Sequence, residues 1–125
     1  MLDYQDILSA FYYLNQKYNL SDGIYIELKN AVPSFQYIWP VEESNLIFKF
    51  STIEEFMNAY SSITSSNTEI NTIIYKSTFI TLKYIVSYNR IFISTESFND
   101  ISHLHDILNQ KGVKEIIYKF KNYNN

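Results

Sequence analysis

The sequence contains no cysteine, which excludes disulfide bonds, thiol catalysis and thiolate metal sites together. Its two glycines, Gly23 and Gly112, stand far apart, so a glycine-rich phosphate-binding loop is excluded as well. Arginine occurs once, at Arg90, and the net charge is -3, which disfavours a surface that follows a nucleic-acid backbone. The chain therefore lacks the groups on which several common activities depend.

Long hydrophobic runs are also missing, because polar residues interrupt every apolar stretch before it reaches the ~18 residues of a spanning helix. The first residues are acidic where a secretory signal would be basic. Together with the lack of cysteine, these features predict a cytoplasmic protein without a membrane segment. The length of 125 residues and the 46% hydrophobic content fit one domain with its own core.

Aromatic residues are abundant, with twelve tyrosines and nine phenylalanines. Two explanations remain open. Aromatic side chains are enriched at recognition surfaces, so their number could reflect binding. An AT-rich coding sequence, as in a low-GC bacterium, phage, virus or plasmid, would favour the same residues together with Ile, Asn and Lys.

A strand-helix-strand pattern occurs twice in the chain. Residues 45–76 begin with an apolar strand, start a helix at a Thr52–Glu55 capping box and close on Ile-Ile-Tyr-Lys. Residues 90–119 follow the same order and close on the same four letters. Here Ser97 with Asp100 starts the helix and Gly112 ends it. The pattern predicts two β-α-β-type units.

The other elements are predicted from periodicity. A helix is expected over residues 3–19, with Asp3 and Asp6 at its start, and a strand with one buried face over 24–29. Residues 30–44 are irregular, with a short edge strand at 35–39. Between the two units we expect strands near 70–77 and 79–87, although one long bent strand is an open alternative.

These elements predict a single α+β domain. Residues 1–44 hold a helix, a strand and an irregular aromatic segment, 45–121 hold the two β-α-β-like units, and 122–125 form a frayed tail. A mostly antiparallel or mixed sheet with a ferredoxin-like arrangement would place the two helices of the units on one face. The additional N-terminal helix and strand would then extend an edge or cover part of the other face. Such an architecture does not define a function.

Groups suited to catalysis are few. His103 and His105 would point about 200° apart on one helix, so they cannot bind the same ion from it; His105 borders the apolar face and His103 faces solvent. Glu42, Asp100 and Asp106 could converge on a cation in a metal-dependent nuclease, but their spacing does not require it. We therefore predict no enzyme activity and no cofactor.

Aromatic rows on a sheet can stack nucleic-acid bases when they face outward. Tyr75, Phe92 and Tyr118 would have this role only on an outward face, and they would be core residues if they faced the helices. Because the net charge is negative, direct nucleic-acid binding is disfavoured.

The leading hypothesis is a non-catalytic protein-protein interaction module, such as a small acidic inhibitor or immunity-type protein that blocks a nuclease or a defence complex. A rigid aromatic row beside paired negative charge is the main candidate surface. The predicted partner-binding residues are Tyr37, Trp39, Glu42 and Glu43, with Tyr12 and Tyr13. The alternatives are a homodimeric small-molecule-binding regulatory domain and a small metal-dependent nuclease.

Overall fold

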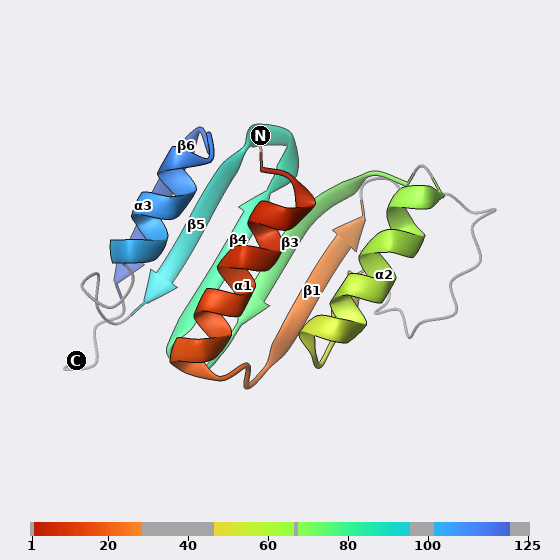
Figure 1. Cartoon of the computed structure of the whole chain (residues 1–125), viewed down its shortest axis with the longest axis horizontal. Coiled ribbons are helices and arrows are strands. Elements are labelled where there is room, and N and C mark those ends of the chain that lie inside the picture. The colour runs from red at the N-terminus through yellow and green to blue at the C-terminus, as the bar shows by residue number, and fades with distance from the viewer. Residues whose placement is uncertain (1, 29–46, 67, 96–101, 121–125) are drawn as a thin grey trace.

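The computed structural model describes residues 2–28, 47–66, 68–95 and 102–120, which form one six-stranded mixed sheet and three α-helices (Figure 1). The α+β class is thus confirmed, and the ferredoxin-like arrangement is not. The elements are α1 (Tyr4–Tyr18), β1 (Gly23–Leu28), β2 (Ile47–Phe50), α2 (Ile53–Ser65), β3 (Ile70–Lys76), β4 (Ile80–Ile85), the 3-10 helix η1 (Val86–Tyr88), β5 (Arg90–Thr95), α3 (Ser102–Gln110) and β6 (Glu115–Phe120).

The strand order across the sheet is β2-β1-β3-β4-β5-β6. Neighbouring strands are antiparallel except for β5 and β6, which are parallel. Because β2 and β3 are each antiparallel to β1, they run parallel to one another on either side of it. The N-terminal strand was expected at an edge or over the other face of the sheet. It instead lies inside the sheet, between the two strands that α2 connects.

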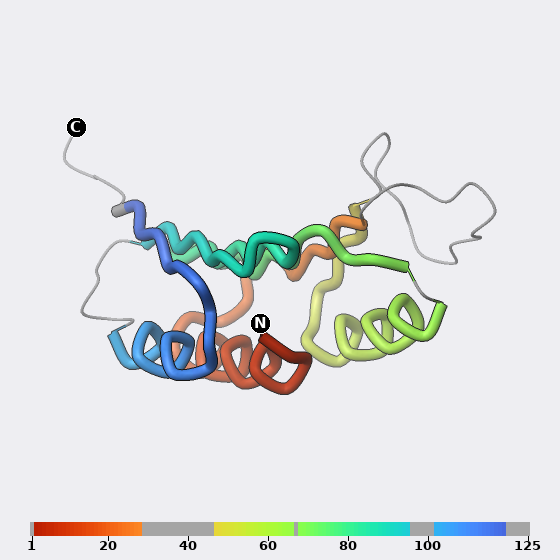
Figure 2. The backbone as a smooth tube through the Cα atoms, turned by 90° about the horizontal axis from the view of Figure 1, so that it is seen from above, coloured from red at the N-terminus to blue at the C-terminus, as the bar shows by residue number. Residues whose placement is uncertain are grey.

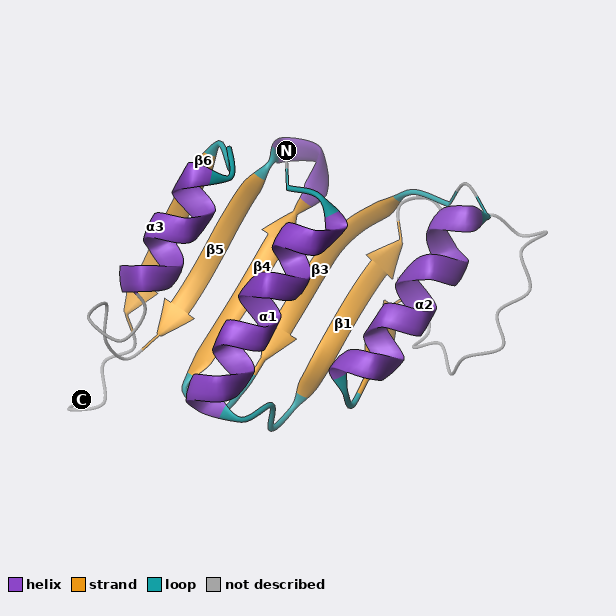
Figure 3. Ribbon diagram, in the orientation of Figure 1, coloured by secondary structure: helices purple, strands orange, loops and turns teal. Residues whose placement is uncertain are grey.

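All three helices lie side by side on one face of the sheet, as the view along the sheet shows (Figure 2). Each turns an apolar stripe toward the strands, with Phe11 and Leu14 of α1, Phe56 of α2 and Leu104 of α3 fully buried. Figure 3 is viewed from this helix-covered side, with the helices in purple in front of the orange strands. Within the described residues no α-helix covers the opposite face, which we call the open face (Figure 2). No described helix is both long and apolar enough to cross a bilayer.

The first two helices begin at side-chain caps. Asp3 Oδ1 accepts from the Asp6 backbone N–H at 2.9 Å, and Asp6 Oδ2 accepts from that of Asp3 at 3.1 Å, which completes the expected capping box. The Asp6 N–H also lowers the pKa of Asp3. In α2, Thr52 Oγ1 accepts from the Glu55 N–H at 3.1 Å as predicted. The Glu55 carboxylate, however, accepts from the Ser51 N–H at 2.9 Å.

Two strands, not one long bent strand, follow α2. The Ser77 N–H donates to the Ile80 carbonyl at 2.9 Å and closes the turn between β3 and β4. At the opposite end of β4, Asn89 adopts a left-handed conformation (φ 53°) after η1. Its side chain accepts from the Tyr84 hydroxyl at 3.0 Å and donates to the Gly112 carbonyl at 2.9 Å. This residue thereby joins the β4–β5 turn to the end of α3.

Some predicted features lie outside the described residues. They are the edge strand at 35–39, the cap formed by Ser97 and Asp100, and the tail at 122–125. Where it is described, the end of α3 agrees with the prediction, because Gly112 has a φ of 86° just after the helix.

Candidate functional site

Outward side chains on the open face alternate along each strand with buried side chains that face the helices. In β5, Ile91 and Ile93 are buried, whereas Phe92 between them is 37% exposed. The strand registers arrange the outward residues in rows across the sheet. One row is Lys49, Tyr25, Ile74, Lys83, Phe92 and Ile117, and the next is Ile47, Glu27, Thr72, Ile85, Arg90 and Glu115.

Charge is divided unequally between the two faces. Among the described residues, the open face and its rim carry five cations, Lys49, Lys76, Lys83, Arg90 and Lys119, against three carboxylates, Asp22, Glu27 and Glu115. The described helices and their flanking loops carry the reverse excess, with Asp3, Asp6, Glu54, Glu55, Glu69 and Asp106 against Lys17, Lys111 and Lys114. A chain with a net negative charge therefore presents a cationic sheet surface.

The cations at the β2 end of the open face are already paired. Asp22 lies 3.6 Å from both Lys49 Nζ and Lys76 Nζ, and it accepts a hydrogen bond from the Tyr25 hydroxyl at 2.6 Å. The Tyr25 hydrogen bond, followed by the two ammonium groups, lowers the pKa of Asp22. Both ammonium groups also lie within 5.8 Å of the Tyr25 ring centroid. Both ammonium groups at this end therefore have a carboxylate partner, and the three charges together keep an excess of one positive charge.

On the β4–β6 part of the open face, fewer of the cations have an ion-pair partner among the described residues. Arg90 pairs with Glu115 at 2.9 Å across β5 and β6. No described carboxylate forms an ion pair with Lys83 or Lys119. Lys83 stands opposite Phe92 in the β4–β5 register. An exposed aromatic ring and unpaired ammonium groups thus lie close together on this part of the sheet.

A hollow of about 590 Å³ lies on the open face where β3 and β4 meet η1. Its lining consists of Glu27, Asn71, Thr72, Lys83, Ile85, Ser87 and Tyr88. The register shifts between Glu27 and Leu28, so both Asn71 and Thr72 reach the same carboxylate. Glu27 accepts from Asn71 Nδ2 at 2.5 Å and from Thr72 Oγ1 at 3.2 Å.

Exposure differs sharply across this hollow. Thr72 is only 2% exposed and lies deep, whereas Tyr88 is 62% exposed and has Arg90 5.8 Å from its ring centroid. Two neutral donors orient the Glu27 carboxylate without offsetting its negative charge, and Lys83 is the cation among the lining residues. The hollow therefore combines one aliphatic side chain, Ile85, with an aromatic rim, one cation and several polar groups.

Of the three tyrosine and phenylalanine residues considered for base stacking, only Phe92 faces outward. Tyr75 is completely buried on the helix side, with its ring 5.3 Å from that of Phe11. Tyr118 faces α3, where its hydroxyl lies 2.6 Å from His105 Nδ1. Burial raises the pKa of Tyr118 to about 12, with a further contribution from the charge of Asp106. The row of outward aromatics proposed from the sequence is not formed.

The predicted partner-binding residues are only partly described. Tyr37, Trp39, Glu42 and Glu43 lie outside the described residues. Tyr12 is 44% exposed and donates to Met57 Sδ of α2 at 3.6 Å.

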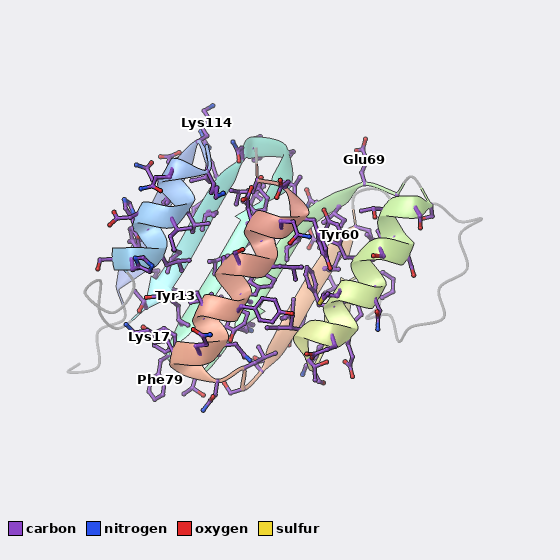
Figure 4. All side chains as sticks on the ribbon, viewed as in Figure 1. Tyr13, Lys17, Tyr60, Glu69, Phe79 and Lys114 are labelled. Carbon is purple, nitrogen blue, oxygen red and sulfur yellow. The ribbon has the colours of Figure 1, made fainter. Side chains whose placement is uncertain are left out.

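Tyr13, the other described residue of this group, is half-buried on the opposite side of α1, with its ring 5.5 Å from that of His103 in α3 (Figure 4). Tyr12 faces α2. The two tyrosines therefore do not form one surface.

The histidines have the exposure that the helical pattern predicted. His103 is exposed, and His105 is half-buried against Tyr118. Among the described residues, no three His, Asp or Glu side chains lie close enough together to hold a metal ion. Of the three acids considered for a cation site, Glu42 and Asp100 are outside the described residues, and Asp106 lies on α3.

A second cavity lies on the helix side, between the ends of α1 and α2 and the sheet. Its volume is about 270 Å³, and its lining includes Ile7, Tyr60, Glu69 and Tyr84. Figure 4 shows Tyr60 on the side of α2 that faces α1, where its ring stacks on that of Tyr4 at 4.5 Å. Pockets that enclose a drug-sized ligand usually exceed about 300 Å³. This cavity suits at most a small apolar molecule.

Sequence reasoning missed the open face as a candidate surface. A signal for it was present in β4, where Ile80, Leu82 and Tyr84 alternate with Thr81 and Lys83. The alternation separates the two faces of the strand. It does not show which of them the helices cover.

Comparisons with other proteins add no family to this description. The chain matches no protein-family model, no curated protein and no solved structure.

Proposed function

We propose that this protein is a non-catalytic protein-interaction module that binds its partner through the open face. The observation that carries the proposal is the one-sided covering of the sheet. All three described helices lie on one face, while the other presents Ile74, Ile85, Phe92 and Ile117 among cations.

The composition of this face supports an interface. In antiparallel sheets with one solvated face, the outward residues are usually polar. Here Ile74, Ile85 and Phe92 lie outward on the inner strands, with Lys83 among them, so apolar and charged side chains are mixed across the face. Protein-protein interfaces combine apolar and aromatic side chains with polar groups in this way.

The narrower proposal is an acidic inhibitor or immunity-type protein that blocks a nuclease or defence complex. It is supported by the net charge of -3 and by the small size of the chain. Its acidic contact residues, Glu42 and Glu43, lie outside the described residues. The homodimeric regulator and the metal-dependent nuclease remain alternatives without a specific observation in their favour.

A capture experiment tests the use of the open face. The purified protein is immobilised and exposed to lysate of its native host, in parallel with a Phe92→Ser/Ile85→Thr variant. Loss of a central aromatic anchor should weaken binding by about 2 kcal/mol or more, which is about thirtyfold in affinity. We expect a stoichiometric protein that the wild type retains and the variant loses, as measured by quantitative mass spectrometry.

Tyr12→Ser is the matched control, since Tyr12 is exposed to a similar degree, 44% against 37% for Phe92, but lies on the helix side. This variant should retain the partner. If the partner stays bound to the open-face variant and is lost from the Tyr12 variant, the open face is not the interface. Circular dichroism and thermal melting establish that all three proteins are folded.

A further inference from the structure

We infer that the partner presents an acidic protein surface to the open face and inserts one large apolar side chain into the hollow beside Lys83. This inference rests on the proposed binding of a protein through the open face and adds to it the chemistry of the partner. It departs from the narrower proposal of an acidic inhibitor, whose contact residues Glu42 and Glu43 would require a basic partner surface. It is argued from the unpaired charges, the shape of the hollow and the kinds of side chain that surround it.

Charge complementarity indicates that the contact surface of the partner is negatively charged. At the β2 end, Asp22 forms ion pairs with both Lys49 and Lys76, although one carboxylate offsets only one of the two positive charges. Toward β6, Lys83 and Lys119 have no described carboxylate partner. A carboxylate from another protein could pair with each of them without displacing an existing ion pair. Complementary charge of this kind accelerates association and fixes the relative orientation of two proteins.

The hollow gives the position of the apolar contact. Ile85 lines it, Thr72 lies at its base, and Tyr88 stands at its rim. Thr72 uses its hydroxyl to hold Glu27, so it donates no further hydrogen bond to a ligand. A leucine or phenylalanine side chain would fit these surroundings, with a neighbouring carboxylate directed at Lys83. Anchors of this type supply most of the binding energy in many interfaces.

A protein fits these features better than single-stranded nucleic acid does. Base stacking requires aromatic rings in series, but most of the large aliphatic residues of the open face are isoleucines, and Phe92 is the one outward member of the three candidates. Tyr25 is engaged with Asp22 and two lysines. A second copy of the chain fits less well too, because two open faces brought together would oppose cations to cations.

Amide NMR spectra of the labelled full chain test the chemistry with defined probes. The probes are a helical peptide of Glu and Leu, the matching peptide of Lys and Leu, and oligothymidine. The acidic peptide should shift the amide signals of Lys83, Ile85 and Phe92. Lys83→Glu should weaken its binding about tenfold, which corresponds to reversal of one close charge contact.

Lys17→Glu is the control, because it makes the same charge change on α1. It should alter affinity by less than about twofold, since exposed charges beyond a Debye length are screened. The inference is overturned if the acidic peptide leaves these signals unchanged, if the Lys-Leu peptide binds as tightly, or if oligothymidine alone binds this face. The last result would assign the face to nucleic acid.

The lysate experiment separates the two proposals. If Phe92→Ser/Ile85→Thr abolishes capture but neither Lys83→Glu nor added salt changes it, the proposed function stands and the acidic partner is refuted. If the open-face variants and the charge variant all retain the partner, both proposals fail. Sensitivity of capture to the apolar variant, the charge variant and salt supports both.

Discussion

Tyr75 should make the fold less stable at alkaline pH. Its side chain is completely buried between the sheet and α1, and burial raises its pKa from 10.0 to about 12. The unfolded chain therefore loses the phenol proton near pH 10, whereas the folded chain keeps it until about pH 12. Below that window the contribution of the neutral phenol is fully present, and it is lost as the pH rises through it.

The size of the effect follows from the shift. Each pKa unit corresponds to about 1.4 kcal/mol, so the wild type should lose about 2 to 3 kcal/mol between pH 10 and pH 12 through this residue. Tyr75→Phe removes the titrating group. At neutral pH it removes the hydrogen bond from the Tyr75 hydroxyl to Asn15 Oδ1, 3.1 Å long, at a cost of about 1 kcal/mol. Asn15 Oδ1 keeps its bond from the Leu20 N–H.

The two proteins should therefore exchange their order of stability. Wild type is expected to be more stable at pH 7 and the phenylalanine variant at pH 12, as measured by urea unfolding across the pH range. Tyr118, whose pKa is also raised to about 12, is present in both proteins, so the difference isolates Tyr75. A stability difference that stays constant from pH 7 to pH 12 would refute the reasoning, as would a spectroscopic titration of the buried phenol near its ordinary pKa.

Two further predictions concern the left-handed positions at the end of β4 and after α3. Asn89→Ala should destabilise the fold by about 2 to 3 kcal/mol, because it loses both side-chain hydrogen bonds and keeps a positive φ. Asn89→Gly should cost about 1 kcal/mol less. Equal free energies of unfolding for the two variants in chemical denaturation would contradict the role of backbone conformation. Gly112→Ala should lower the stability of the fold by about 1 kcal/mol through its φ of 86° alone, since an added Cβ meets no atom within 4 Å. Gly112→Asn should lower it less. An unchanged melting temperature for the alanine variant would exclude that strain.

Local features of the fold were predictable from the sequence. The starts of α1 and α2 follow from Asp3 and Thr52 with the acids three residues later, because a cap and its first turn lie within one short segment. The end of α3 at Gly112 was predictable for the same reason. The detail that Glu55 reaches Ser51 was not, since either backbone N–H lies within range of that carboxylate.

Pairing between distant segments was not predictable in this way. Tyr25 pairs with Ile74 although nearly fifty residues separate them, and periodicity does not identify the partner of a strand. The direction of the side chains in β5 was not predictable either. Ile91, Phe92 and Ile93 are all apolar, so either face of the strand could have been the buried one. The open face and its charge could therefore be identified only once the positions of the helices were known.

The position of β1 between β2 and β3 also has a consequence for folding during synthesis. The ribosome produces α1 and β1 before the other described elements, but β1 gains its second neighbour only after β3 has been made. In contrast, β3, β4 and β5 pair with strands that follow them directly in the chain. Contacts between distant segments form slowly because of the chain entropy lost on closing a long loop. We expect β1 to wait longer for its second neighbour than the other inner strands do, so that its apolar side chains, Ile24 and Ile26, stay exposed for a long interval on the nascent chain.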